Sequence, residues 1–290
     1  MIQPGCVRPR TGILVLDFDG TMTDAEAEGA PFRDGYLDDL CALVGRRPGD
    51  PEVTVIAEEV EAELAASPGE HGFTWNGKVV APASVDPYLR MVPIASRIFD
   101  CFGAFLDADD RGRLLRSVLY KYNYEKTQPV FRPGARALLA GLRGTETFVV
   151  TNSGTAHVAR KITALDGGSG EAAWLASRVH GDAGKFVVDN TFIAVPAELP
   201  VPGLARPVLV RRRSYHDVLH KLCGGRWDQL TVVGDIFELD LALPLVLGAK
   251  VVLVANGYTP PYEVAFVAGH ARGRVVRDLA DLGANAAARP

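Results

Sequence analysis

The sequence predicts an α/β fold in which a Rossmann-like, doubly wound parallel sheet carries an inserted α-helical domain. The apolar runs of the chain are continuous rather than alternating, which suits strands that are covered on both faces. Stretches with helical spacing lie between these runs, as expected when parallel strands are joined by crossover helices. From about residue 25 to 127 this rhythm stops, and the sequence becomes mostly helical.

Five segments are interpreted as buried strands, the last of them the weakest: Gly12–Phe18, Thr147–Thr151, Leu230–Gly234, Lys250–Ala255 and Arg274–Val276. The expected helices between them are Ala135–Leu142, Ala156–Leu165, Tyr215–Leu222 and Leu239–Leu247. The segment Lys185–Arg206 departs from this alternation, with an expected short strand over Lys185–Asp189 and a proline-rich excursion.

The helical insert is expected to hold Tyr36–Val44, Pro51–Ala66, Pro87–Phe105 and Arg111–Tyr122, with a loop or hairpin over Phe73–Ala83. The flanking segments Glu26–Arg33 and Lys126–Pro133 contain proline, and the first also glycine, so we expect hinge loops there. The predicted organisation is therefore a core domain of residues 1–24 and 128–290 and a helical domain of residues 25–127.

The composition is that of a globular protein and excludes several other classes. The 290 residues are 48% hydrophobic and 23% charged, which argues against disorder or a coiled coil. With a net charge of −4, the chain lacks the overall positive charge that favours binding to nucleic acid, and we expect no nucleic-acid partner. Cys6, Cys41, Cys101 and Cys223 lack metal-ligand spacing, and we expect free thiols in a reducing compartment. The first eleven residues lack a signal-peptide pattern and no apolar run reaches about 20 residues. We therefore expect a cytoplasmic protein with no membrane partner.

The most informative stretch follows the first strand and reads DFDGT. Asp17 and Asp19 leave the carboxyl end of a buried strand, where open α/β sheets place their ligands. Alternate residues of an extended chain share a face, so both carboxylates can point into one site. Gly20 allows a sharp turn and Thr21 can hydrogen-bond back to the loop. An exposed turn is the alternative interpretation, but the preceding ILVL run favours a site.

These residues resemble the motifs of the haloacid dehalogenase-like (HAD) superfamily, in its phosphatase branch. Asp17–Thr21 matches the first motif, DxDGT, and Phe148–Asn152 matches the second, a hydrophobic strand ending in Thr or Ser. Thr231–Asp235, followed by Glu238 and Asp240, matches the Gly-Asp motif. The resemblance covers residues 1–24 and 128–290, and the helical insert occupies the place of a type 1 cap.

The resemblance implies a reaction and a metal. Asp17 would be the nucleophile that forms an aspartyl-phosphate, and Asp19 would protonate the leaving group and then activate water. Mg²⁺ would be held by the Asp17 carboxylate, the Asp19 backbone carbonyl and Asp235, with Asp240 or Glu238 nearby.

The phosphate site is less clearly indicated. The resemblance places the phosphoryl group on Thr151, the amide of Asn152 and a cation. The family usually has a lysine some two dozen residues before Gly-Asp, where this chain has three arginines. Arginine can bind phosphate through two hydrogen bonds, and we expect Arg212 in this role, with Arg211 next. Lys185 is the rival candidate.

The function that this sequence predicts is Mg²⁺-dependent hydrolysis of a small phosphate monoester. A phosphomutase of the same architecture and a catalytically inactive HAD-like binding protein are the alternatives. The retained Asp17, Asp19, Thr151 and Asp235 argue against the inactive protein. The identity of the small phosphorylated substrate and the oligomeric state are not predicted.

Overall fold

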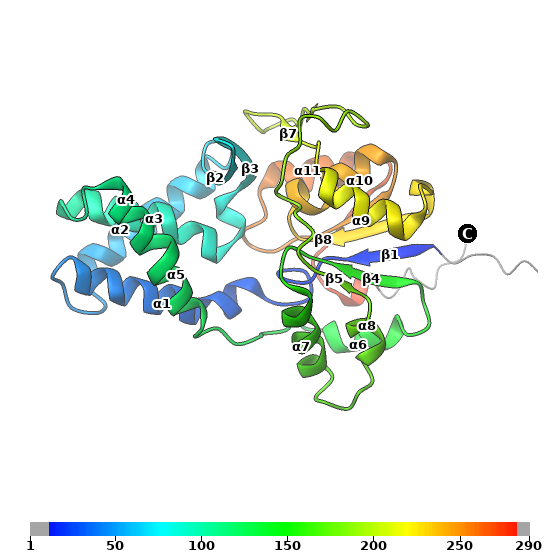
Figure 1. The fold of residues 1–290 in the computed structure, drawn as a ribbon, viewed down its shortest axis with the longest axis horizontal. Coiled ribbons are helices and arrows are strands. Elements are labelled where there is room, and N and C mark those ends of the chain that lie inside the picture. The colour runs from blue at the N-terminus through cyan, green and yellow to red at the C-terminus, as the bar shows by residue number, and fades with distance from the viewer. Residues whose placement is uncertain (1–11, 283–290) are drawn as a thin grey trace, which may run out of the picture.

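A six-stranded parallel sheet forms the centre of the molecule, in the order β10-β9-β8-β1-β4-β5 (Figure 1). The computed structural model describes residues 12–282. The strands are β1 (Ile13–Leu16), β4 (Thr147–Val150), β5 (Val179–His180), β8 (Leu230–Gly234), β9 (Lys250–Val254) and β10 (Gly273–Val276). All five expected strands are confirmed. The sixth, β5, has two residues, too few to give a strand pattern in the sequence.

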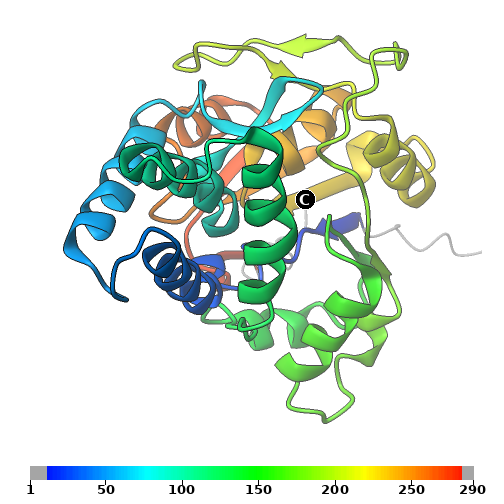
Figure 2. The same ribbon diagram turned by 60° about the vertical axis from the view of Figure 1, so that its left-hand side comes forward.

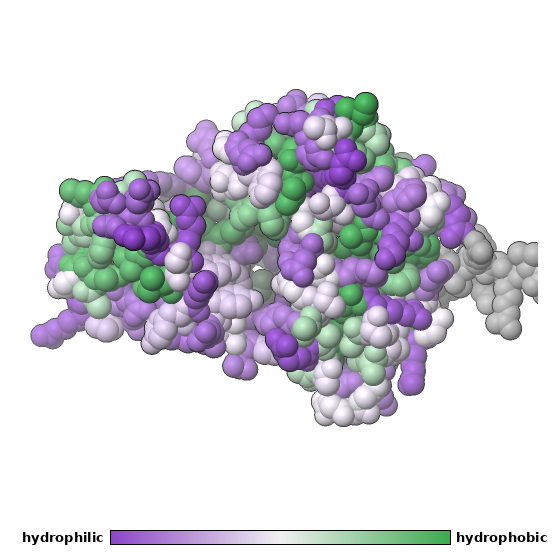
Figure 3. Space-filling model, in the orientation of Figure 1, coloured by the Kyte–Doolittle hydropathy of each residue, from purple (hydrophilic) through white to green (hydrophobic). Residues whose placement is uncertain are grey.

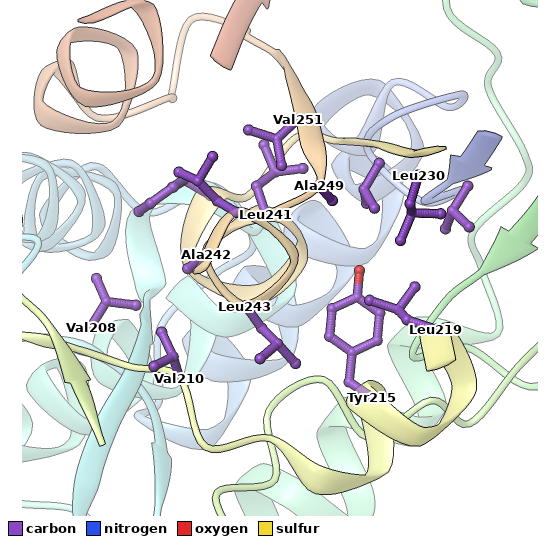
Figure 4. Packing of buried hydrophobic residues seen from close by; sticks show 14 of the residues in the cluster. Val208, Val210, Tyr215, Leu219, Leu230, Leu241, Ala242, Leu243, Ala249 and Val251 are labelled. Atoms are coloured by element: carbon purple, nitrogen blue, oxygen red, sulfur yellow. The ribbon is translucent and has the colours of Figure 1, made fainter. Parts of the chain in front are cut away.

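Helices cover both faces of the sheet, which confirms the predicted doubly wound fold. Along a strand, Val232 belongs to one hydrophobic cluster and Val233 to the other, so successive side chains enter opposite layers. The first layer contains α9 (Arg213–Cys223), α10 (Ala242–Leu247) and α11 (Pro261–Gly269). The second contains α6 (Ala135–Gly141), α7 (Thr155–Leu165) and α8 (Ala173–Ala176). Figure 4 shows the first layer from close by, with Tyr215 and Leu219 of α9 beside Leu243 of α10.

Residues 25–127, which lie between β1 and β4 in the chain, form the predominantly helical region at the left of Figure 1 and are here called the inserted segment. Its helices are α1 (Ala25–Leu43), α2 (Pro51–Ala66), α3 (Pro87–Phe102), α4 (Ala108–Arg113), the π-helical stretch Leu114–Leu119 and α5 (Tyr120–Tyr124). Figure 2 brings these helices forward. They enclose their own hydrophobic cluster, in which Phe32, Ile94 and Phe99 are fully buried. The division into two domains at residues 24 and 128 stays a prediction.

Helix α1 begins about ten residues earlier than we expected, so the predicted hinge loop over Glu26–Arg33 is wrong. The carboxylate of Asp24 accepts a hydrogen bond from the Ala27 N–H at 3.0 Å and so caps the helix. Pro31 lies inside the helix, and the neighbouring Phe32 packs edge-on against the ring of Tyr88. Burial of this face outweighs the low helix propensity of glycine and proline.

The inserted segment also contains the expected hairpin, made of β2 (Gly72–Trp75) and β3 (Lys78–Pro82) and followed by the short 3₁₀ turn Ala83–Val85. Another small antiparallel pair lies in the excursion, where β6 (Glu198–Leu199) pairs with β7 (Val208–Leu209). The strand expected over Lys185–Asp189 does not form. A turn begins at Lys185 instead, and its side chain is buried.

The structure also bears on the expected free thiols and on the expected lack of membrane-spanning helices. Cys41 and Cys223 are buried free thiols and Cys101 is an exposed one, whereas Cys6 lies outside the described residues. Within residues 12–282, no helix combines the length and the apolar character that crossing a membrane requires.

Candidate active site

The DFDGT loop leaves β1 at the carboxyl edge of the sheet and brings Asp17 against β8. The Asp17 N–H donates to the Val233 carbonyl at 2.8 Å, so the residue continues the strand pairing into the loop. Thr21 then turns back, and its hydroxyl lies 3.2 Å from Asp17 Oδ2 and 3.0 Å from Asp235 Oδ1. Gly20 adopts a φ of +83°, and any Cβ there would collide with the Asp235 carboxylate. This loop can therefore approach Asp235 because residue 20 has no side chain.

Three buried carboxylates meet at this edge: Asp17, Asp235 and Asp240 each offer an oxygen within 4.8 Å of the others. Asp235 follows β8, and Asp240 lies on the π-helical turn Phe237–Leu241, which leads into α10. Lys185 reaches into the group, with its Nζ 2.6 Å from Asp17 Oδ1 and 2.8 Å from Asp240 Oδ1. One ammonium facing three carboxylates leaves the cluster with surplus negative charge.

The electrostatics of the cluster reflect its burial. Desolvation raises the pKa of Asp17 to about 7 although Lys185 opposes the shift, and it also raises the pKa of Asp235. Burial alone would lower the pKa of the Lys185 ammonium. The carboxylates of Asp17 and Asp240 outweigh this effect and raise that pKa above its ordinary value. Lys185 therefore stays protonated. A further positive charge beside it would stabilise the ionised forms of the acids.

This donor set suits a hard divalent cation. Its atoms are carboxylate oxygens, and when all three acids are ionised beside one ammonium the cluster carries a charge of −2 that a divalent cation would neutralise. Of the ligands the resemblance implied, Asp17 and Asp235 lie in the cluster. The implied contribution of Asp19 is its backbone carbonyl, which follows Asp17 in the same loop. Asp240, expected near the metal, is a member of the cluster.

Lys185, rather than Arg212, is the cation that contacts Asp17. The Arg212 guanidinium is buried and donates to three backbone carbonyls, those of Leu209, Lys185 and Val80. Burial lowers its pKa to about 10, which leaves it charged at neutral pH. Arg212 thus connects the core to β3 of the inserted segment, and its donors are directed at the backbone. We therefore correct our expectation for Arg212: its guanidinium donates to backbone carbonyls, and the rival candidate Lys185 is the cation beside Asp17.

Arg211 is also directed away from the cluster, toward the carbonyls of Val195 and Asn190 in the excursion. The excursion explains why the spacing argument failed. It separates Lys185 from Asp235 by about 50 residues, so the position two dozen residues before Gly-Asp falls on the arginine run instead. The signal that identifies Lys185 is its contact with the second motif, because its N–H donates to Asn152 Oδ1 at 2.8 Å.

The second motif and Asp19 lie at the opening of this cluster. Thr151 is buried at the end of β4, and its hydroxyl accepts from the Ser153 N–H at 3.1 Å. The Asp19 carboxylate is directed toward β4 and α7, with Oδ2 2.6 Å from the Ser153 hydroxyl and Oδ1 2.7 Å from Lys161 Nζ. Ser153 and Lys161 were not among the predicted site residues, and nothing in the sequence pattern singled out Lys161.

Glu238 does not join the carboxylate cluster. It is fully buried and accepts two hydrogen bonds from Arg206, at 2.7 and 2.9 Å, and one from the Tyr262 hydroxyl at 2.8 Å. Arg206 also donates to the Gly69 carbonyl at 3.0 Å, just before β2. Glu238 therefore supports the attachment of the hairpin to the core, while Asp240 occupies the position beside Lys185.

A pocket of about 290 Å³ lies between the core and the inserted segment. Figure 3 shows the surface hollowed between the inserted segment at the left and the core at the right. Asp19, Asn152 and Asp235 form part of its core side. The charged side chains of Glu28, Asp86 and Lys161 also line it. So do several aromatic rings: Phe73, Tyr88, Tyr120, Tyr124 and Phe186.

Solved structures provide the comparison that decides the fold. No protein-family model matches the chain, and no curated protein matches it. A predicted phosphoglycolate phosphatase from Haemophilus somnus is 17% identical, with a TM-score of 0.50 over 94% of this chain and 97% of that one. The chain has the haloacid dehalogenase-like fold.

Other solved structures are also similar to this HAD-like chain. One is a HAD-hydrolase from Bacillus subtilis that was solved with magnesium bound; it is 17% identical and has a TM-score of 0.49 over 94% of this chain and 97% of that one. Another is an L-2-haloacid dehalogenase, 14% identical, with a TM-score of 0.45 over 96% of this chain and 100% of that one.

The HAD-like fold accounts for the meeting of distant motifs at one place. Strands β8, β1 and β4 are neighbours and run parallel, so their carboxyl ends lie at the same edge of the sheet. Asp235, Asp17 and Thr151 follow these three ends, although up to 218 positions separate them in the chain. A ligand bound at this edge would touch all three, as expected for an open α/β sheet.

Proposed function

We propose that this protein is an Mg²⁺-dependent phosphatase that hydrolyses small phosphate monoesters through an aspartyl-phosphate on Asp17. The observation that carries the proposal is the buried Asp17 carboxylate, held at a strand end by Lys185 and Thr21 and within 4.8 Å of Asp235 and Asp240. A nucleophile, a fixed cation and a hard-cation donor set are the parts that phosphoryl transfer requires.

In the first step, an Asp17 carboxylate oxygen attacks the phosphorus while the bond to the leaving oxygen breaks. Asp19 gives its proton to that oxygen, and the alcohol departs. In the second step, the ionised Asp19 takes a proton from water as the water attacks the phosphorus and the bond between phosphorus and the Asp17 oxygen breaks. Inorganic phosphate leaves, and both carboxylates return to their starting states.

The other residues of the site would bind the phosphoryl group and the metal ion. Lys185, Thr151 and the backbone amide of Asn152 would bind the phosphoryl oxygens. The carboxylates of Asp17 and Asp235 and the carbonyl of Asp19 would hold Mg²⁺, with Asp240 beside them. When bound, Mg²⁺ supplies positive charge that offsets the repulsion between these acids and the substrate phosphate.

The pocket restricts the substrate. About 290 Å³ accommodates a small phosphate ester, and the aromatic walls contributed by Tyr88, Tyr120 and Tyr124 favour a leaving group with apolar or planar character.

Phosphate release from an aryl phosphate and a panel of metabolite phosphates, with and without Mg²⁺, tests the proposal. We expect Mg²⁺-dependent turnover that Asp17→Asn lowers by about 10⁴-fold or more, the scale for loss of a nucleophile. Asp228→Asn, which changes an exposed carboxylate, is the control and should retain activity. Absence of turnover on every compound, or an Asp17→Asn variant within tenfold of the wild type, would overturn the proposal.

A further inference from the structure

Lys161 is a buried lysine beside the site that the proposed reaction leaves without a role. It lies on α7, with a side chain that is 7% exposed, and its ammonium bridges two carboxylates. One is Asp19, whose Oδ1 is 2.7 Å away, and the other is Glu28 on α1 of the inserted segment. The contact therefore links the core, the DFDGT loop and the inserted segment at one atom.

The burial of this lysine indicates a specific role. Removing an ammonium from water is costly unless carboxylates replace the lost hydration. Burial would lower the pKa of Lys161, but Asp19 and Glu28 more than compensate and raise it. Glu28 is itself buried, with a side chain that is 6% exposed, whereas the Asp19 side chain is 32% exposed.

The geometry at Asp19 is equally specific. Its two carboxylate oxygens have separate partners, because Ser153 donates to Oδ2 at 2.6 Å and Lys161 donates to Oδ1 at 2.7 Å. Two anchors on different atoms fix the plane of the carboxylate as well as its position. Both anchors come from the segment that follows β4, and Lys161 is in turn fixed by the inserted segment.

Resting on the phosphatase function proposed above, we propose that Lys161 is a positioning residue for the acid–base group Asp19 and that Glu28 holds it in place. Because Ser153 and Lys161 each hold one oxygen, the Asp19 carboxyl group keeps a single orientation and need not rotate into place before it reaches the leaving oxygen. Lys161 thus favours the step in which the leaving group takes the proton. Its contribution depends on how much protonation the leaving group needs.

This dependence gives a test that a structural role would not pass. An aryl phosphate whose phenol is acidic departs with little help from an acid, whereas an alkyl phosphate needs the proton. The value of kcat/KM reports the steps up to departure of the first product and excludes hydrolysis of the aspartyl-phosphate. We expect Lys161→Met to lower kcat/KM at least about 30-fold for an alkyl phosphate and less than threefold for the acidic aryl phosphate.

Three further variants sharpen the comparison. Lys161→Arg retains the charge and should recover part of the loss on the alkyl phosphate. Glu28→Gln should lower kcat/KM for the alkyl phosphate more than for the acidic aryl phosphate. In the double variant, its effect and that of Lys161→Met should be less than additive. Lys221→Met, which changes an exposed lysine on α9, should leave both substrates unaffected.

The outcomes separate the two proposals. If the wild-type protein hydrolyses neither ester, the phosphatase function fails. If it hydrolyses both and Lys161→Met loses the same factor on each, or loses nothing, the positioning role is overturned and the function stands. Thermal unfolding is measured for every variant. Should Lys161→Met fail to fold, Glu28→Gln takes its place in the comparison, and equal losses on the two esters overturn the proposal.

Discussion

The Nζ atom of Lys185 lies 2.6 Å from Oδ1 of Asp17, in a position where both groups are almost inaccessible to solvent. The same ammonium contacts Asp240 at 2.8 Å, so it neutralises part of the charge on two neighbouring acids. Because the lysine contacts the carboxylate that we propose as the nucleophile, we expect it to orient Asp17 and to bind the phosphoryl group. Arg212, one of the largest fully buried side chains, reaches no carboxylate of this cluster.

The first prediction separates these two cations. Lys185→Met removes a charge-assisted contact to phosphate, which typically contributes about 1.5–3 kcal/mol, so we expect kcat/KM to fall about ten- to a hundredfold or more. Arg212→Met leaves three buried carbonyls without their donor, and each costs about 1–3 kcal/mol. Arg212→Met should therefore lower the free energy of unfolding and leave kcat/KM per folded molecule within tenfold of the wild type.

Steady-state kinetics and urea unfolding of both variants are the measurements. Arg213→Met, which changes an exposed arginine next to Arg212, serves as the control for the loss of one charge. A folded Arg212→Met variant with a hundredfold lower kcat/KM, alongside a Lys185→Met variant that remains active, would return the phosphate-binding role to the arginine.

The second prediction concerns stability and pH in the absence of metal. Burial raises the pKa of Asp17 from 3.8 to about 7, so between these values the folded protein holds a proton that the unfolded chain has lost. The free energy of unfolding should fall as the pH rises through this window. In the presence of a chelator, we expect the melting temperature to fall more between pH 5 and pH 8 for the wild type than for Asp17→Asn.

Added Mg²⁺ should restore the wild-type melting temperature at pH 8, because a bound cation stabilises the ionised acids of the folded state. It should do so less well for Asp17→Asn, which lacks one of the proposed ligands. Equal falls in melting temperature for the two proteins would show that Asp17 does not titrate with a raised pKa.

The third prediction addresses the metal. Asp235→Asn keeps the size of the side chain and removes one charged ligand from a small set, so the concentration of Mg²⁺ that half-saturates activity should rise at least about tenfold. Glu263→Gln is a matched control, because it changes another buried acid to its amide at a position outside the carboxylate cluster. An unchanged half-saturation in Asp235→Asn would remove Asp235 from the metal site.

Much of the fold could be predicted because its strands are locally distinctive. The runs around Val15, Val149 and Val232 are buried on both sides of a parallel sheet, and continuous apolar sequence is what such strands require. Asp17 directly follows one of these runs, and the resemblance to the haloacid dehalogenase-like motifs indicated Asp235 at the end of another. Helix α1 was misjudged at Pro31, where burial of the neighbouring Phe32 decides the structure and leaves no local signal.

The parts that the sequence did not reveal depend on contacts between distant segments. Lys185 approaches Asp17 across 168 positions, and Lys161 approaches Glu28 across 133. A lysine that enters a site from a turn has no periodic pattern. The arginine run at Arg212, by contrast, lies just before a helix and about two dozen residues before Gly-Asp. A positive charge at this place is what the family's third motif predicts. Its role in anchoring β3 follows from burial, which becomes visible only once the inserted segment is packed against the core.

The last prediction uses two glycines with similar backbone conformations. Gly20 has a φ of +83° and Gly45 a φ of +74°, so alanine is strained at both positions, by about 1–2 kcal/mol. A Cβ at Gly45 meets no atom within 4 Å, whereas one at Gly20 collides with the Asp235 carboxylate. Gly45→Ala therefore measures the backbone cost alone. Gly20→Ala should lose a further 1–3 kcal/mol or so in the free energy of unfolding.

The same substitution should also disturb the metal site, because the collision is relieved by moving Asp235 away from Asp17. We expect Gly20→Ala to raise the half-saturating Mg²⁺ concentration, as Asp235→Asn does, and Gly45→Ala to leave it unchanged. Urea unfolding and Mg²⁺ titration of the two alanine variants provide both readouts. If they lose the same stability and bind Mg²⁺ equally well, the close approach of the DFDGT loop to Asp235 is not a requirement of the site.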